Sequence, residues 1–397
     1  MPIFTRALGA QMDNFLSNLP LLNDAEVEML ALAAEEENPI LLFCPDLLKA
    51  QAKLFLDCFN GTVAFATKAN PSPDIIKKLF EAGLKTFDVA SINEIELVQH
   101  NCPTAELHYN NPIRSKREIS IAYEKGIRSF SVDRLSELNK LRQCVEPTHT
   151  TLSIRFKLDL ESGEYNFGSK FGASIEEAKQ LIKQAEQQGF KIAIAFNVGT
   201  QCNSPNPWIE YLKAAHQLME ETGTHKVEWI NIGGGFPSYR TLEKPQTKQI
   251  LEAIEKTVRT LFKNPPRLIC EPGRSLVADA FSLITTIKAI PSDNHLFLND
   301  GIYGTLSELL LVGIANRIEA FSPKGQKRKD EVQEMVIFGP TCDSVDVLPA
   351  ALNIPKDIAT EDYLIFHGLG AYSTSTCTRF NGYGNYQIIN VKNFNFS

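Results

Sequence analysis

The residues of this chain best suited to covalent chemistry lie in 63–71, VAFATKANP, where a lysine, Lys68, ends an apolar run. The run has the composition of a β-strand, and Asn70-Pro71 stops it. Lysine is rarely buried, so an amine at this place is unusual as a structural group. Burial lowers the pKa of an amine, and a neutral amine can form a Schiff base with a carbonyl group. The alternative is a lysine that caps a strand and reaches solvent, and the residues that follow decide between the two.

Two later motifs could hold an anion and a nitrogen heterocycle. Gly233-Gly234-Gly235 follows an apolar run, and successive glycines let backbone N–H groups approach an anion such as phosphate. Further on, Arg274 has the geometry to bind phosphate, and Glu271 could keep a ring nitrogen protonated. A flexible turn at the glycines and an ion pair between Glu271 and Arg274 are the structural alternatives. An amine, an anion-binding loop and a ring acid are together what pyridoxal phosphate requires.

The elements that must position these residues alternate between β-like and helical patterns. Apolar runs that predict strands lie at 62–67, 86–89, 106–109, 129–132, 151–156, 192–198, 227–232 and 267–270. Segments with helical period lie between them, including 73–82, 92–100, 115–125 and 175–187. Eight such units over about 220 residues predict an α/β fold with a (β/α)₈ barrel at 41–276. A doubly wound sheet is the competing fold, but no GxGxxG motif follows the first strand.

Polar residues gather at the predicted carboxyl ends of these strands. In order they are Lys68, Asp88, Asn111, Asp133, Arg155, Asn197 with Thr200, the triple glycine, and Glu271 with Arg274. In a (β/α)₈ barrel these ends meet at one mouth, which is where such enzymes carry their active sites. The spacing therefore predicts one site that contains an amine, acids and an anion-binding loop.

The rest of the chain predicts a second domain. Beyond residue 276 the pattern changes to β-rich segments at 281–290, 296–298, 334–338, 362–366 and 386–391. This predicts a mainly antiparallel β-domain at 277–397. The N-terminal segment 1–40, with an acidic amphipathic helix pattern at 12–38, is expected to join that domain.

Composition excludes several classes of function. The net charge of −7 argues against nucleic acid or an anionic membrane as a partner, and no run of eighteen apolar residues predicts a membrane span. The N-terminus lacks the pattern of a signal peptide. Eight scattered cysteines without a CxxC pair form neither a disulfide framework nor a metal site. We therefore expect a cytoplasmic protein without a metal that acts on a small molecule.

A series of motifs in one order resembles a known family. They are Ala66-Thr-Lys-Ala-Asn, Phe87-Asp-Val-Ala-Ser with Glu94, Tyr109-Asn-Asn-Pro, Lys170-Phe-Gly, Gly233-Gly-Gly, Glu271-Pro-Gly-Arg, Asn299-Asp-Gly-Ile-Tyr-Gly, Gly339-Pro-Thr-Cys-Asp-Ser and Gly370-Ala-Tyr. Over about 39–383 the chain resembles the fold-type III pyridoxal-phosphate decarboxylases, which are alanine-racemase-like, and within them the ornithine/lysine decarboxylases. The resemblance implies a carbon–carbon lyase that uses pyridoxal 5′-phosphate.

The resemblance also implies a role for each matching residue. Lys68 would hold the cofactor covalently, and Glu271 would bind its pyridine nitrogen. The phosphate would be bound by Thr200, Gly234, Gly235, Arg274 and Tyr372. Asp88 and Arg155 would support the 3′-oxygen side of the ring, and Asn197 stands where the family has the histidine that stacks on it.

Other implied roles require a homodimer, because in this family the active sites are shared across the interface. Cys342 would reach in from the partner subunit and reprotonate the α-carbon, and Asp343 would pair with the distal amine of the substrate. Tyr303 and Val312 would lie on the substrate side. Lys170 and Asp346 resemble an intersubunit salt bridge of the family.

The substrate follows from charge. A carboxylate at Asp343 attracts a distal ammonium and repels a distal carboxylate. L-Ornithine, giving putrescine for polyamine biosynthesis, is the expected substrate, and L-lysine or a related amino acid with a distal amine is the alternative. Ornithine decarboxylases often carry an aspartate where this chain has Val312, which indicates an altered chain-length preference. An amino-acid racemase and a non-catalytic regulatory homologue are less favoured alternatives.

Overall fold

The computed structural model describes residues 37–159, 170–224, 226–240, 244–292, 294–313 and 317–394. The chain forms two compact units: 52–237 with 245–273, and 1–51 with 238–244 and 274–397. The predicted amphipathic helix at 12–38 and most of the N-terminal segment lie outside the described residues. The predicted domain limits at 40/41 and 276/277 stay a prediction.

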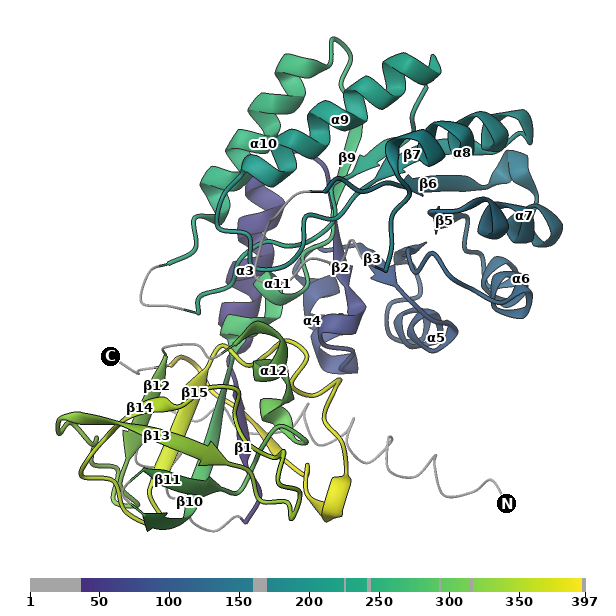
Figure 1. Cartoon of the computed structure of the whole chain (residues 1–397). Coiled ribbons are helices and arrows are strands. Elements are labelled where there is room, and N and C mark those ends of the chain that lie inside the picture. The colour runs from purple at the N-terminus through teal and green to yellow at the C-terminus, as the bar shows by residue number, and fades with distance from the viewer. Residues whose placement is uncertain are drawn as a thin grey trace, which may run out of the picture. The chain divides into compact units, whose positions relative to one another are not determined.

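The unit that contains 52–237 is a closed barrel of eight parallel strands (Figure 1). The strands are β2 (Thr62–Ala66), β3 (Thr86–Val89), β4 (Glu106–Tyr109), β5 (Ser129–Val132), β6 (Thr151–Arg155), β7 (Lys191–Ala195), β8 (Trp229–Asn231) and β9 (Arg267–Cys270). Pairing of β9 with β2 closes the barrel. The strands are almost continuously buried, which is typical of parallel strands covered by helices. This confirms the predicted fold.

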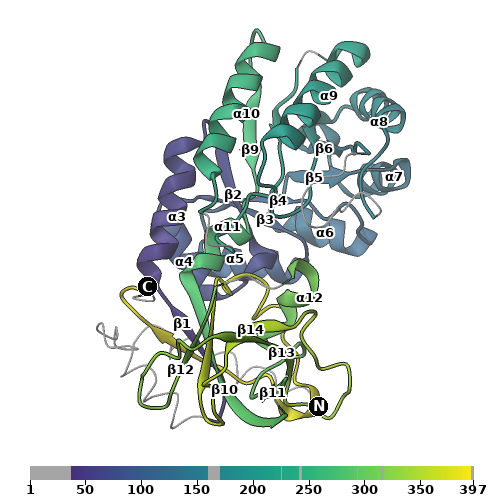
Figure 2. The same ribbon diagram turned by 60° about the vertical axis from the view of Figure 1, so that its left-hand side comes forward.

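Helices surround these strands (Figure 2). They are α4 (Pro73–Glu81), α5 (Ile92–Asn101), α6 (Lys116–Glu124), α7 (Leu135–Cys144), α8 (Ile175–Gln187), α9 (Asn206–Thr222) and α10 (Thr247–Leu261), while α3 (Pro45–Cys58) precedes the first barrel strand. Local sequence sets several of their first residues: Ser115 with Glu118 and Ser174 with Glu177 form capping boxes at α6 and α8. None of the described helices has the length and apolarity that crossing a bilayer requires.

The other unit is built on an eight-stranded, mainly antiparallel sheet. Its strands are β1 (Ile40–Phe43), β10 (Phe281–Ser292), β11 (His295–Leu298), β12 (Ile318–Phe321), β13 (Val332–Phe338), β14 (Leu352–Pro355), β15 (Tyr363–His367) and β16 (Gln387–Asn390). Strand β1 pairs with β10 in antiparallel and with β16 in parallel orientation. The β-domain is thus confirmed, whereas β12 and β14 were not predicted.

Short helices carry several residues of interest. They are η1 (Thr67–Ala69), η2 (Pro147–His149), α11 (Arg274–Val277), η3 (Ala278–Ala280), η4 (Thr305–Glu308), α12 (Leu309–Val312) and η5 (Phe380–Gly382). Lys68 therefore lies in a single helical turn that directly follows β2. This turn ends the strand one residue earlier than the apolar pattern predicts.

Candidate active site

Lys68 projects from the barrel mouth beside an acid from the next strand. Its Nζ lies 3.4 Å from Oδ2 of Asp88, a residue of β3 that is almost fully buried. The lysine side chain is 52% exposed, so the prediction of a desolvated amine is wrong for this arrangement. Strand β2 is buried, but the turn η1 carries Lys68 out of the apolar layer. The amine is accessible to a ligand and held near a carboxylate.

Glu271, which follows β9, is held by two asparagines to which the sequence assigned no role. Its Oε1 accepts a hydrogen bond from Nδ2 of Asn110 at 2.6 Å, and another from Nδ2 of Asn231. Burial raises the pKa of Glu271 to about 7; the charge of Asp88 adds to this shift and that of Lys68 opposes it. An acid with this pKa can carry or release a proton near neutral pH.

The triple glycine is a tightly packed loop. A Cβ on Gly233, which has φ +68°, would lie 2.5 Å from the carbonyl oxygen of Phe196, and one on Gly234 would lie 2.6 Å from that of Glu271. Gly235 has φ +91° and accepts a hydrogen bond from the amide of Cys202 at 2.9 Å. The loop therefore leaves no room for larger residues, which would collide with the neighbouring backbone.

Three further predicted residues lie at the carboxyl ends of β6 and β7. Arg155 ends β6, and its guanidinium lies 5.3 Å from the ring centre of Phe171. Burial lowers the pKa of Arg155, while the negative charge of Glu271 opposes that shift. Oδ1 of Asn197 accepts the amide of Gly199 at 2.9 Å, which folds this side chain back on its own loop. Thr200 is half-buried in the same loop.

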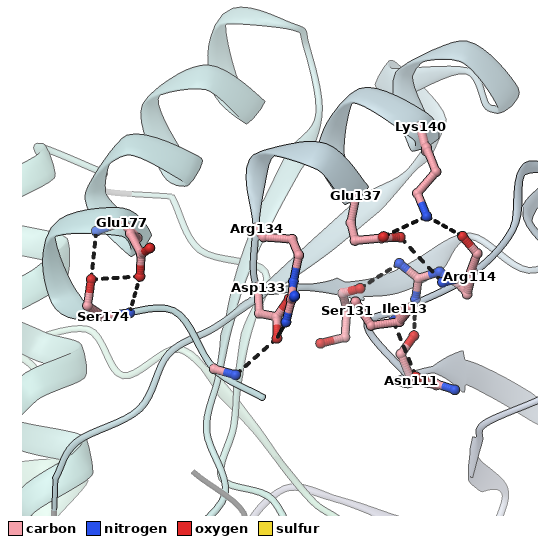
Figure 3. A network of polar contacts seen from close by, with 11 residues as sticks. Asn111, Ile113, Arg114, Ser131, Asp133, Arg134, Glu137, Lys140, Ser174 and Glu177 are labelled. Atoms are coloured by element: carbon pink, nitrogen blue, oxygen red, sulfur yellow. Dashed lines mark hydrogen bonds and ion pairs between the residues drawn. The ribbon is translucent and has the colours of Figure 1, made fainter. Parts of the chain in front are cut away.

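A polar network ties together the loops that follow β4 and β5 (Figure 3). The buried guanidinium of Arg114 donates to the carbonyl oxygens of Tyr109, Asn111 and Ser131. Oε2 of Glu137 accepts the amide of Arg114 at 3.3 Å. Burial lowers the pKa of Arg114 to about 10. These bonds rigidify the backbone next to Asn110 without entering the candidate site.

Asp133, which the sequence placed at the mouth, is used in the same region. It pairs with Arg134 at 2.7 Å and accepts the amide of Gly172 at 3.0 Å (Figure 3). Its carboxylate therefore has a structural role between two loops.

Replacing Arg114 by alanine should destabilise the barrel unit strongly. The change removes donors from three carbonyl oxygens inside the protein, and unsatisfied buried acceptors cost about 1–3 kcal/mol each. We expect a loss of about 3 kcal/mol in the free energy of unfolding, measured by urea denaturation. Arg128→Ala is the matched control, because that exposed arginine also donates to carbonyl oxygens. Equal losses in both variants would contradict the prediction.

In the unit with the β-domain, Arg274 begins α11 and is largely buried. It forms an ion pair with Glu308, a buried residue that the sequence did not single out, and its guanidinium lies 5.1 Å from the ring centre of Tyr372. Tyr372 has φ +62°, which is unusual for a residue with a side chain and is typical of functional sites. Glu271 and Arg274 therefore each have another partner, so the predicted alternative in which they pair with each other is not needed.

In the Cys342-Asp343 motif of the same unit, Cys342 is exposed and Asp343 is half-buried. The hydroxyl of Tyr303 donates to Oδ2 of Asp343 at 2.7 Å and lowers the pKa of that carboxyl. Sγ of Cys342 lies 3.2 Å from Oδ1 of Asn381. Val312, by contrast, is buried, and its carbonyl oxygen accepts from Arg240 at 2.9 Å. The motif thus offers an ionised carboxylate and a thiol at the surface.

Asp346 is held by groups of its own chain, and its predicted intersubunit pair with Lys170 stays a prediction. Its carboxylate is buried and accepts the amides of Ile302 and Thr341, each at 3.0 Å, and the hydroxyl of Thr341 at 2.7 Å. A Cβ on Gly301 would collide with the same carboxylate. Asp346 thus organises the loops of its own chain around its carboxylate.

His367 has a structural role. Its Nδ1 lies 2.8 Å from Oγ of Ser282, and its Nε2 lies 3.0 Å from Oε2 of Glu319. His367 and Ser282 are buried within the sheet. The ring therefore ties two strands of the sheet together.

The donor set at the barrel mouth fits pyridoxal phosphate. It combines an exposed amine at Lys68 with an acid, Glu271, whose pKa lies near 7. Among the described residues, Thr67 Oγ1 and Asn110 Oδ1 are buried polar atoms without a hydrogen-bond partner. A polar ligand at the mouth is the natural partner for such atoms.

The comparison with known families agrees with this chemistry. A family model described as pyridoxal-dependent decarboxylase, pyridoxal binding domain, matches residues 46–278. The chain belongs to this family. It is therefore a fold-type III decarboxylase of amino acids that depends on pyridoxal phosphate, as the motifs predicted.

Individual relatives cover most of the chain. A lysine/ornithine decarboxylase of Selenomonas ruminantium is 32% identical over 337 residues, 81% of each protein. The decarboxylase flvG of Aspergillus flavus is 30% identical over 348 residues, 80% of this chain and 77% of the relative. A lysine/ornithine decarboxylase from Vibrio vulnificus, solved with cadaverine, is 28% identical and has a TM-score of 0.80, with 94% of this chain and 100% of that one covered.

Proposed function

We propose that this decarboxylase acts on a basic L-amino acid, and that its substrate is L-ornithine and its product putrescine. The observation that carries the proposal is the half-buried carboxylate of Asp343, which the Tyr303 hydroxyl keeps ionised. A fixed negative charge selects a distal ammonium over a distal carboxylate. The solved Vibrio vulnificus relative in complex with putrescine supports this class of ligand.

L-Lysine is the second candidate. Val312 stands where an acid is often found in ornithine decarboxylases, so the distal amine has one carboxylate fewer to meet. Two relatives are lysine/ornithine decarboxylases. One methylene changes binding by only about 1–3 kcal/mol, so both substrates fit this charge arrangement.

Different residues of the barrel bind different parts of the cofactor. Lys68 binds it covalently, Glu271 holds its ring nitrogen, and Asp88 and Arg155 support the 3′-oxygen side. Asn197 replaces the stacking group of the family. We assign the phosphate to Thr200, Gly234 and Gly235 of the barrel and, from their motifs, to Arg274 and Tyr372. When bound, the cofactor supplies a protonated ring that draws electrons from the substrate α-carbon as carbon dioxide leaves.

The Cys342-Asp343 motif completes the proposal from the partner subunit of a homodimer. The Cys342 thiol delivers the proton that replaces carbon dioxide on the α-carbon. Asp343 binds the distal amine of the same substrate, with Tyr303 beside it, and Val312 ends the short helix α12. In the single chain Cys342 is exposed and Asp343 is half-buried, so neither side chain is enclosed by its own chain.

We place the enzyme in the cytoplasm, as part of polyamine biosynthesis. Its cysteines are free thiols, including the exposed Cys342. A thiol that must deliver a proton has to stay reduced, which a reducing compartment ensures.

The test is release of carbon dioxide from L-ornithine, L-lysine, L-arginine and meso-diaminopimelate by the protein with pyridoxal phosphate. We expect turnover of ornithine and lysine, and loss of turnover in Cys342→Ala. Turnover of diaminopimelate alone would contradict the proposal. Loss of optical activity without carbon dioxide would indicate a racemase, and cofactor binding without any reaction would indicate a regulatory protein.

A further inference from the structure

The environment of Glu271 contains a hydrogen-bond arrangement that none of the sequence motifs describes. Asn110 follows β4, Asn231 ends β8 and Glu271 follows β9, so three strands of the barrel bring these side chains together. Both asparagines donate Nδ2 to the same oxygen, Oε1 of Glu271. Within the described part of the chain, Oε2 has no such donor. The carboxylate therefore presents one occupied and one available oxygen.

The backbone decides which end of the Asn231 side chain faces Glu271. Oδ1 of Asn231 accepts the amide N–H of Gly233 at 2.9 Å. Turning the amide over would place its oxygen against the carboxylate and its NH₂ group against that N–H, and both contacts would be repulsive. Asn231 is thus fixed as a donor to Glu271.

The same residue connects Glu271 to the glycine loop. Besides the contact of Asn231 with Gly233, the amide of Glu271 donates to the carbonyl oxygen of Gly233 at 2.8 Å. Gly233 has φ +68°, a backbone conformation that this hydrogen-bonded ring holds in place. The group proposed for the ring nitrogen and the loop proposed for the phosphate therefore share one rigid connection.

We propose that Asn231, together with Asn110, is a positioning residue that keeps Glu271 ionised and directs its Oε2 to the ring nitrogen of the cofactor. The inference rests on the role proposed for Glu271. Two amide donors favour a carboxylate over a carboxylic acid, since both bonds are accepted by its oxygen. Asn231 also fixes the distance between the ring acid and the phosphate loop.

The asparagines act against other groups that face Glu271. Burial raises its pKa, and Asp88 of β3 raises it further. The charges of Lys68 and Arg155, and the hydrogen bond from Asn231, lower it. Because the balance lies near neutral pH, losing one donor shifts the carboxyl toward its protonated form.

The experiment follows the Glu271 carboxyl by infrared difference spectroscopy of the apoprotein between pH 5 and pH 9, with Glu271→Gln assigning its band. Asn231→Asp keeps the acceptor for Gly233 and replaces the donor by a second acid, and Asn110→Ala removes the other donor. We expect the midpoint of the Glu271 titration to rise by about one pH unit in each variant. Dissociation constants for pyridoxal phosphate should rise about tenfold.

Asn111→Ala is the matched control, because Nδ2 of Asn111 donates to the carbonyl oxygen of Ala90 and does not contact Glu271. It should leave the midpoint unchanged. An unchanged midpoint in both Asn231→Asp and Asn110→Ala overturns the inference, even if the variants are less stable. Glu271→Gln that binds the cofactor as tightly as the parent protein overturns instead the role proposed for Glu271, so the two failures are distinguishable.

Discussion

Lys68→Ala is expected to lower kcat/KM for decarboxylation by roughly 10³-fold or more, because the cofactor loses its covalent attachment and the amine that exchanges with the substrate. Lys68 is half-exposed at the mouth, and Asp88 lies within 3.4 Å of its amine. The segment 62–71 contains no second lysine that could replace Lys68. Steady-state kinetics on L-ornithine measure the loss.

Spectroscopy separates this explanation from misfolding. The visible absorption band of the lysine-bound cofactor should disappear, while added methylamine should restore part of the activity by replacing the missing amine. Lys77→Ala, at an exposed lysine of α4, should behave as the parent protein. A Lys68→Ala protein that keeps a tenth of the activity would contradict the assignment.

The second large effect is expected at Asp343. Asp343→Asn keeps the size of the side chain and removes its charge, so KM for L-ornithine should rise about a hundredfold. Turnover of L-norleucine, which has no distal amine, should not fall. Asp330→Asn, at an exposed aspartate of the same unit, is the matched control. Equal losses on ornithine and norleucine would mean that Asp343 supports the structure and does not bind the amine.

Tyr303→Phe extends this prediction to pH. The Tyr303 hydroxyl lowers the pKa of Asp343, so removing it should let that pKa rise toward its usual value. Asp343 would then become protonated at a higher pH, and the acidic limb of the kcat/KM profile for ornithine should move upward. A profile that coincides with that of the parent protein would exclude this role for Tyr303.

The sequence was sufficient for the barrel because each strand has its own apolar run and each helix its own period. Several strand limits, such as those of β3 and β9, agree with the prediction to the residue. Strands β12 and β14 were missed since they are short and only partly buried. Hydrogen bonds to their pairing partners, β15 and β13, stabilise these two strands, whose own sequences have only a weak strand pattern.

The sequence predicted the site residues that belong to charged motifs. It did not predict the residues whose role depends on tertiary contacts. The pattern singled out Asn111, but the neighbouring Asn110 contacts Glu271. Which of two successive residues faces the mouth depends on how the chain turns after β4. Asn231 gave no signal either, because a polar residue at the end of an apolar run is common. Glu308 was missed because its partner, Arg274, lies 34 positions away in the sequence (308 − 274).

Because the chain is made from its N-terminus, the pairing of β1 with β10 and β16 is delayed during synthesis. The barrel unit ends at Gly273, so all its strands have left the ribosome before the last residues of the β-domain are made. Strand β1 acquires its contacts later still. The thiol of Cys44, just beyond β1, donates a hydrogen bond to the carbonyl oxygen of Lys392, 348 residues downstream. Such long-range contacts form slowly. The apolar segment Ile40–Phe43 therefore stays without its β16 partner until the end of translation, and a nascent chain stopped before β16 should leave that edge of β1 unpaired.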